Sequence, residues 1–505
     1  MFREIHHMRV RQGEPMLPRR RRWDALLLGL YAALYLVLFL PSARYPGLVW
    51  LTLVPTALAL WFGPLALVSG RGDRQWYDPA TLFNFALFYY GIKGVSLATG
   101  QCPTYLDSMS YPKIVSGYHL VAFCTTAGIL GWWIGYRWAL GQVGRREDQT
   151  IQASDLSSCC PERMSSYRPH IGVLLLSLVG LASLAMFFHS TGIGVLTLIH
   201  NPFQRCYLTD GSMGVAAPLA NLWKVGIGMF PLASLFWLAT TEQGSKPSPF
   251  LWAHASAGLC LHLMVSGRAG LLAFVVSMVF LYHLRVRNIS LGGFGVLCAA
   301  AITYAYVIRT WRHVVGTLGQ AQGNDLWSAL SVQGLYSFLN STDLSDIRFF
   351  VLISDVYGQS LPLKYGTTLL RVFSQLVPRS LWPTKPVDLG VEIGELYGAG
   401  PLTGSPPGFF AEMYMNFGVL GVLIGSALLG VALALLYQRW MCRHSEPAST
   451  ALYAIFLPSV LLLPSATFAN VVITLTFSVA GTIFAFRVSA PWSSDTRADI
   501  AWRSD

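Results

Sequence analysis

The run 377-VPRSLWPTKP-386 places two cations, Arg379 and Lys385, on a backbone stiffened by three prolines. Proline fixes φ, so the segment has little conformational freedom to lose when it binds a ligand. Arginine binds phosphate oxygens through its planar fork, and lysine binds them as a point charge. The segment could therefore hold a phosphate or a similar anion. A plainer alternative is that Trp382 and the two cations anchor it at a membrane interface.

Other basic residues are predicted to lie at one similar depth in the membrane. Lys93 and Lys224 fall inside apolar runs, Arg268 lies at the end of one, and Arg309 and Arg312 lie at the end of another. A charge inside a membrane is costly and tends to be functional. We therefore predict that cations from several segments share one anion site near one face of the membrane. The alternative for each residue is that its side chain snorkels to the lipid headgroups.

Two groups stand out as candidates for proton transfer. Glu412 enters an apolar run, and His313 directly follows Arg312. A carboxylate or an imidazole can orient or deprotonate an attacking hydroxyl. Further candidates are Asp343, Asp346, Glu392 and Glu395. For each of them the alternative is a surface acid or a helix cap. The sequence favours Glu412 as the base.

Metal chemistry has no support in the residue pattern. The eight cysteines show no Cys-x-x-Cys or His/Cys metal spacing, and no Asp-x-Asp triplet occurs in the chain. Such spacings are what indicate a zinc site or a disulfide framework. We therefore expect neither a metal nor a cofactor.

The elements that must position these residues are membrane helices. The 505 residues are 53% hydrophobic and only 12% charged, whereas soluble domains are about 25% charged. Long apolar runs predict an all-α polytopic membrane protein of about twelve spans. The candidate spans are 24–41, 47–68, 79–100, 115–140, 170–189, 215–241, 249–266, 269–285, 290–310, 408–437, 450–465 and 467–487.

The distribution of Lys and Arg predicts the orientation. The run 19-RRRR-22 precedes the first span, and most other cations fall in segments that share its side. Cytoplasmic loops collect Lys and Arg, so both termini are expected inside. This bias explains most of the net charge of +11 without a nucleic-acid partner. The predicted divisions are a cytoplasmic basic N-terminus (1–23), helices one to nine (24–310), a large periplasmic loop (311–407), helices ten to twelve (408–487) and a cytoplasmic tail (488–505).

The large loop is predicted to contain short helices. The segments 345–359 and 366–377 both have an amphipathic pattern, and Pro378 ends the second. A loop of this length in a compact protein usually has a function.

Two of these motifs resemble a known family. The run 377-VPRSLWPTKPVDLG-390, followed by 408-GFFAEMYMNFGVLGVLIG-425, is similar to the end of the large outer loop of Wzy-type O-antigen and exopolysaccharide repeat-unit polymerases. The turn 266-SGRAG-270 resembles the surroundings of an arginine in that family. About twelve spans with one large late loop also fit, and the similarity extends over roughly residues 215–440.

The resemblance implies a GT-C-like membrane glycosyltransferase that works without metal. It would polymerise oligosaccharide repeat units carried on undecaprenyl pyrophosphate, at the periplasmic face of the bacterial inner membrane. Arg268, Arg379 and Lys385 would bind donor pyrophosphate or acidic glycan, and Glu412 would lie in the site. The implied partners are the lipid-linked donor and acceptor, membrane lipids and a chain-length regulator protein.

Two other functions use the same features. One is a different lipid-donor glycosyltransferase or an O-antigen ligase, and the other is a polysaccharide transporter or flippase. Transporters favour inverted repeats and charges near the membrane midplane. The two halves of this sequence show no such repeat, and its cations gather toward one face, which favours the polymerase.

Overall fold

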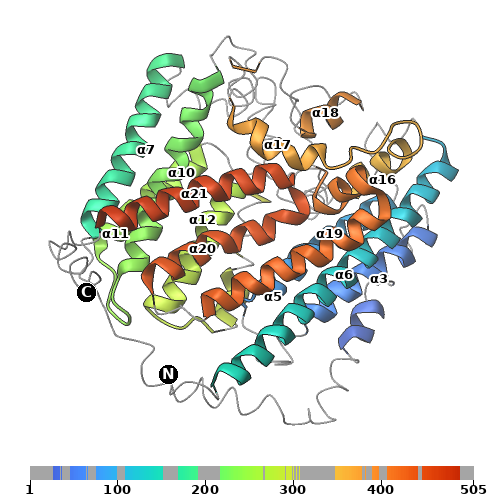
Figure 1. The fold of residues 1–505 in the computed structure, drawn as a ribbon, viewed down its shortest axis with the longest axis horizontal. Coiled ribbons are helices and arrows are strands. Elements are labelled where there is room, and N and C mark those ends of the chain that lie inside the picture. Colours follow the sequence, from blue (N-terminus) through green and yellow to red (C-terminus); the bar gives the residue numbers. More distant parts are fainter. Residues whose placement is uncertain are drawn as a thin grey trace, which may run out of the picture.

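The regular secondary structure of the described residues is helical (Figure 1). A computed structural model describes residues 27–33, 36, 46–63, 65, 76–98, 109–151, 169–191, 217–264, 268–290, 292–297, 300, 303, 306–307, 347–377, 381–382, 389–396, 407–441 and 446–489. The long helices are α3 (Pro46–Phe62), α5 (Pro79–Ala98), α6 (Tyr111–Ile151), α7 (Pro169–Thr191), α10 (Ala217–Thr240), α11 (Pro249–Met264), α12 (Arg268–Arg285), α19 (Phe409–Met441), α20 (Pro447–Leu462) and α21 (Phe468–Ser489). Shorter helices are α16 (Ile347–Val356), α17 (Thr367–Leu376), α18 (Leu389–Leu396) and the 3-10 turn η3 (Leu463–Ser465).

The helices agree with the predicted membrane class. Among the described residues, five helices are long and apolar enough to cross a membrane, and four shorter apolar helices accompany them. The predicted spans coincide with helices except for 24–41 and 290–310, about half of which lies outside the described residues. The total of about twelve spans and the GT-C-like layout therefore stay predictions.

Two helices are much longer than a bilayer requires. α6 has 41 residues and α19 has 33, whereas a bilayer needs about 20 residues. These two helices pack closely through small residues. A Cβ added at Gly135 of α6 would overlap the carbonyl oxygen of Ala427, and one at Gly430 of α19 would overlap that of Trp132. Small residues let membrane helices approach until their backbones touch.

Gly135→Ala is expected to destabilise the α6–α19 pair by about 1–3 kcal/mol, because the added methyl meets backbone that cannot move aside cheaply. Gly141→Ala on the same helix is the matched control, since a Cβ there meets no atom within 4 Å. The thermal unfolding midpoint of the detergent-solubilised protein measures both. Equal midpoints for the two variants would show that the close approach is not essential.

Segments predicted to lie inside gather at one end of the bundle. The Gly244 N–H donates to the Arg285 carbonyl at 2.7 Å, and the Tyr453 hydroxyl donates to the Tyr77 carbonyl at 2.9 Å. Trp440 stacks on Tyr453 with ring centroids 4.2 Å apart. These contacts join segments that the distribution of Lys and Arg assigns to one side of the membrane, and the predicted topology itself stays a prediction.

The short helices of the large loop gather at the opposite end, where α19 begins (Figure 1). We call this the loop end. α16 and α17 confirm the two short helices predicted at 345–359 and 366–377, whereas α18 was not predicted.

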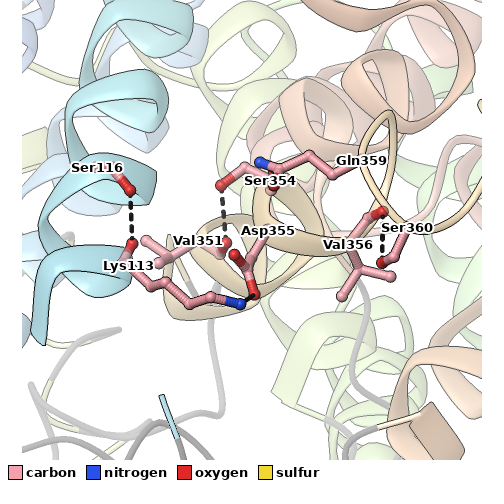
Figure 2. A network of polar contacts seen from close by, with 8 residues as sticks. All are labelled: Lys113, Ser116, Val351, Ser354, Asp355, Val356, Gln359 and Ser360. Atoms are coloured by element: carbon pink, nitrogen blue, oxygen red, sulfur yellow. Dashed lines mark hydrogen bonds and ion pairs between the residues drawn. The ribbon is translucent and has the colours of Figure 1, made fainter. Parts of the chain in front are cut away.

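α16 is held between the spans at the loop end. Its residues Phe349, Phe350 and Ile353 are buried, and the side chain of Val351 would lie 3.0 Å from a Cβ at Gly117 of α6. An ion pair at the rim adds to this contact. Figure 2 shows Lys113 of α6 extended toward Asp355 of α16, with 3.4 Å between Nζ and Oδ2. The helix α16 of the large loop is thus packed into the bundle.

Candidate functional site

The structure describes the predicted site residues to different extents. Glu412 lies in α19 with its side chain described. Lys93, Lys224 and Arg268 lie on α5, α10 and α12, in the halves nearest the loop end, and only their backbone belongs to the described part of the chain. The remaining candidates, Arg309, Arg312, His313, Arg379 and Lys385, lie outside the described residues. The shared cation site therefore stays a prediction.

The hairpin that carries Arg268 has a defined packing requirement. Arg268 is the first residue of α12, and Gly270 follows within its first turn. A Cβ at Gly270 would lie 2.9 Å from Cε1 of His262, a buried residue near the end of α11. The glycine of the Arg-Ala-Gly motif thus makes room for the imidazole that packs between α11 and α12.

α19 is broken close to its start. Gly418 has φ 65° and ψ −154° inside the helix, a conformation in which side chains other than hydrogen are strained. A break leaves the carbonyls that precede it in need of new donors. The large loop supplies them. The Lys364 N–H donates to the Met415 carbonyl at 2.8 Å, and the Tyr365 N–H donates to the Asn416 carbonyl at 3.0 Å.

Asn416 extends this docking through its side chain. Its Oδ1 accepts the Gly366 N–H at 2.8 Å. Its Nδ2 donates to Thr368 Oγ1 at 2.6 Å and to the Glu412 carbonyl at 2.7 Å. The side chain is fully buried, where an unmade hydrogen bond is expensive. The Asn-Phe-Gly string of the family-like motif therefore has a structural role: Gly418 breaks the helix and Asn416 fastens the loop to it.

Glu412 joins the starts of two helices. It is 1% exposed, and its Oε2 accepts the N–H of Phe468, the first residue of α21, at 2.7 Å. A carboxylate at a helix N-terminus is stabilised by the unpaired N–H groups and the helix dipole. The backbone before α19 packs directly against η3, because a Cβ added at Gly408 would overlap the Pro464 carbonyl. This burial does not favour Glu412 as the base, which must reach a substrate hydroxyl.

A charged cluster lies beside the docked loop. Lys364 Nζ is 2.6 Å from Glu392 Oε1, and Arg371 Nη2 is 2.5 Å from Glu392 Oε2. The Tyr357 hydroxyl donates to Glu392 Oε1 at 3.3 Å, and Lys364 also lies over the Tyr357 ring. We call Tyr357, Lys364, Arg371 and Glu392 the loop cluster. It carries two cations and one carboxylate, so one positive charge is in excess.

The pKa values follow from this arrangement. Burial alone would raise the pKa of Glu392, but its hydrogen bonds and ion pairs with Lys364 and Arg371 outweigh burial and hold that pKa below its usual value. Burial and the charge of Glu392 raise the pKa of Tyr357. Glu392 is therefore ionised at neutral pH. A carboxylate with a lowered pKa is a weak general base, which argues against the role considered for Glu392 from the sequence.

The Arg371 guanidinium has one nitrogen, Nη1, whose N–H donors are not used. The residue is 8% exposed, and its Nη1 is buried with no hydrogen-bond partner among the residues that the structure describes. A buried guanidinium N–H without an acceptor is costly, and an added anionic oxygen would satisfy it. The unpaired donor atom and the excess positive charge are the two features of the loop cluster that would suit an anion.

Sequence reasoning missed Lys364, Arg371 and Asn416 as site residues. Lys364 and Arg371 are ordinary loop cations by composition, and Asn416 is one polar residue in a long apolar run. The available signal was Arg371 on the polar face of a predicted amphipathic helix. Within the part of the chain that the structure describes, no three His, Cys, Asp or Glu side chains form a group that could hold a metal ion.

Comparison with known proteins identifies the segment around this site. Residues 394–489 match the family model described as O-antigen polysaccharide polymerase Wzy. The match includes Glu412, Asn416 and Gly418 and runs through α21, so the family resemblance is confirmed for the 408–425 string. The 377–390 string and the 266–270 turn lie outside the match. No curated protein and no solved structure matches the chain.

Proposed function

We propose that this protein is a membrane glycosyltransferase that polymerises lipid-linked oligosaccharide repeat units into O-antigen or exopolysaccharide. The observation that carries the proposal is the match to the polymerase family over residues 394–489. That segment includes the broken start of α19, on which the large loop docks. The donor and acceptor would be units linked to undecaprenyl pyrophosphate, at the periplasmic face of the inner membrane.

The reaction requires charge stabilisation and proton transfer. A sugar hydroxyl of the acceptor attacks the anomeric carbon of the donor, the bond from that carbon to the pyrophosphate oxygen breaks, and the lipid pyrophosphate leaves with its electron pair. Preorganised cations stabilise the charge that develops on the leaving group. A base takes the hydroxyl proton.

The chain offers candidates for both tasks. Arg371 of the loop cluster has a buried donor atom to spare and suits a phosphate oxygen. The predicted cations would join it, namely Lys93, Lys224, Arg268, Arg309, Arg312, Arg379 and Lys385. These charges would take the part that a metal ion plays in other glycosyltransferases. His313 is the proposed base, and Glu412 is proposed as a positioning residue that fixes the start of α19.

The wider architecture belongs to the same proposal. We propose about twelve spans in a GT-C-like layout, with residues 311–407 in the periplasm and both termini in the cytoplasm. The proposed partners are the lipid-linked donor and acceptor, membrane lipids and a chain-length regulator protein.

Reporter fusions test the orientation. A fusion after residue 155 or 445 is expected to show a cytoplasmic location, because these positions lie beyond the ends of α6 and α19 that face away from the large loop. A fusion at residue 330 is expected to show a periplasmic location, since it lies in the predicted outer loop. A fluorescent reporter that folds only in the cytoplasm and a phosphatase active only outside it give opposite signals. A cytoplasmic signal at 330 would refute the orientation.

Deletion of the gene tests the function in the cell. The polymerase proposal predicts that surface polysaccharide on a gel collapses from a ladder to a single repeat unit on its acceptor, and that the wild-type gene restores the ladder. Loss of even the single unit would indicate a ligase or a flippase instead, because those steps come before any unit appears at the surface.

A further inference from the structure

The polarity of α17 is reversed compared with that of a helix on a soluble protein. Three of its polar residues, Thr368, Arg371 and Ser374, are buried, whereas Leu370 and Phe373 are 62% and 69% exposed and share the outward side with Thr367. A helix at a water-facing surface turns its apolar stripe to the core and its polar face outward. α17 turns apolar side chains outward, and exposing these side chains to water is unfavourable.

This orientation is fixed by specific contacts. Thr368 Oγ1 accepts a hydrogen bond from Asn416 at 2.6 Å, and Arg371 pairs with Glu392 at 2.5 Å. Both polar partners lie on the protein side of the helix. Rotating the helix to bury Leu370 and Phe373 would break both contacts. Within the loop cluster, Glu392 would then keep an ion pair with Lys364 alone. The apolar face is therefore an enforced feature of the fold.

The exposed apolar surface continues beyond α17 on its own segment. Tyr365, directly before the helix, is 73% exposed, and its φ of 47° is a left-handed conformation that tyrosine rarely adopts. After the helix, Leu381 is 78% exposed and Trp382 is 40% exposed. Tyrosine and tryptophan are enriched where membrane proteins meet the headgroup region. The composition of this surface is thus typical of a membrane interface.

The same surface is continuous with the lipid-facing side of α19. A Cβ at Gly366, the residue before α17, would lie 3.3 Å from the ring of Phe417, which is 44% exposed. From Phe417 an exposed apolar row runs along α19 through Leu420, Ile424 and Leu428. α19 is among the helices long and apolar enough to cross a membrane. The row on α19 needs lipid around it, and the α17 face extends that row.

We propose that α17 lies in the bilayer interface at the loop end of the bundle, with Leu370 and Phe373 inserted among the lipid chains. An amphipathic helix at an interface buries its apolar face at the boundary between headgroups and chains. The loop cluster then lies on the opposite, protein-facing side of α17. The lipid contact itself does not depend on the proposed polymerase activity.

Photocrosslinking tests the lipid contact directly. The full-length protein carries p-benzoylphenylalanine in place of Phe373, and it is reconstituted into vesicles of phosphatidylethanolamine and phosphatidylglycerol. A probe at Leu428 on α19 is the positive control, because that residue is 64% exposed on a span. A probe at Ser360, in the exposed turn before α17, is the negative control. After irradiation, mass spectrometry identifies what each probe has bonded to.

The expected result is phospholipid adducts at positions 373 and 428 and none at 360. Adducts at 428 alone would overturn the proposal, and so would equal adducts at 373 and 360. A crosslink from position 373 to a second copy of the chain would assign the apolar face to a dimer contact and would also overturn it. Each probe variant is compared at equal amounts of inserted protein, so a folding defect at 373 would appear as loss of inserted protein.

Discussion

Glu412→Ala is expected to abolish polymer formation, whereas Glu412→Gln is expected to retain most of it. The alanine variant removes the acceptor of the Phe468 N–H, a charged hydrogen bond worth about 1.5–3 kcal/mol. It also removes a negative charge from the N-terminus of α21, worth about 0.3–2 kcal/mol. Glutamine keeps an oxygen that can accept the same N–H, so the starts of α19 and α21 should stay joined.

The measurement is polymer formed per amount of inserted protein, together with the thermal midpoint of each purified variant. Rescue by glutamine would identify Glu412 as a positioning residue. A glutamine variant that is inactive yet as stable as wild type would instead show that the negative charge itself is needed, as it would be for a catalytic base.

Arg371→Ala is expected to lower polymer formation roughly ten- to hundred-fold. The change removes the buried Nη1 proposed to bind the anionic donor, and a charge-assisted contact of this kind contributes about 1.5–3 kcal/mol. Arg371→Lys should recover part of the activity, because the charge returns without the planar fork. The same assay, with equal inserted protein, measures all variants.

Two controls separate anion binding from loop stability. Glu392→Ala breaks both ion pairs of the loop cluster but keeps both cations, so it should lose less activity than Arg371→Ala. Lys113→Ala breaks an exposed ion pair at the same end, with side chains 61% and 21% exposed, and such pairs contribute little. If Glu392→Ala were as damaging as Arg371→Ala, the role of Arg371 would be to hold the loop and not to bind an anion.

The membrane helices could be predicted from the sequence because hydropathy is a local property. Each span requires about 20 apolar residues in a row, and the ends of α7, α10 and α12 fall close to the predicted limits. The distribution of Lys and Arg predicts which segments share a side of the membrane, and that topology stays a prediction. The length of α6 was underestimated, because a helix can continue past the membrane with polar residues, where hydropathy carries no signal.

The docking of the loop could not be predicted, because it depends on contacts between residues far apart in the chain. Asn416 binds Gly366 and Thr368 across about fifty positions, and no local pattern encodes that pairing. The amphipathic pattern of α17 was visible, but periodicity does not tell which face turns inward. Burial of Arg371 and exposure of Phe373 depend on Glu392 and Asn416, which three-dimensional packing brings to the helix.

The central claim is tested most directly by reconstitution of the purified protein in vesicles with lipid-linked repeat units as both donor and acceptor. The account predicts products that increase in steps of one repeat unit, formed by wild-type protein and strongly reduced for Arg371→Ala at equal inserted protein. If lipid-linked units stay single in the presence of folded wild-type protein, or are only moved across the bilayer, the protein is not the polymerase proposed here.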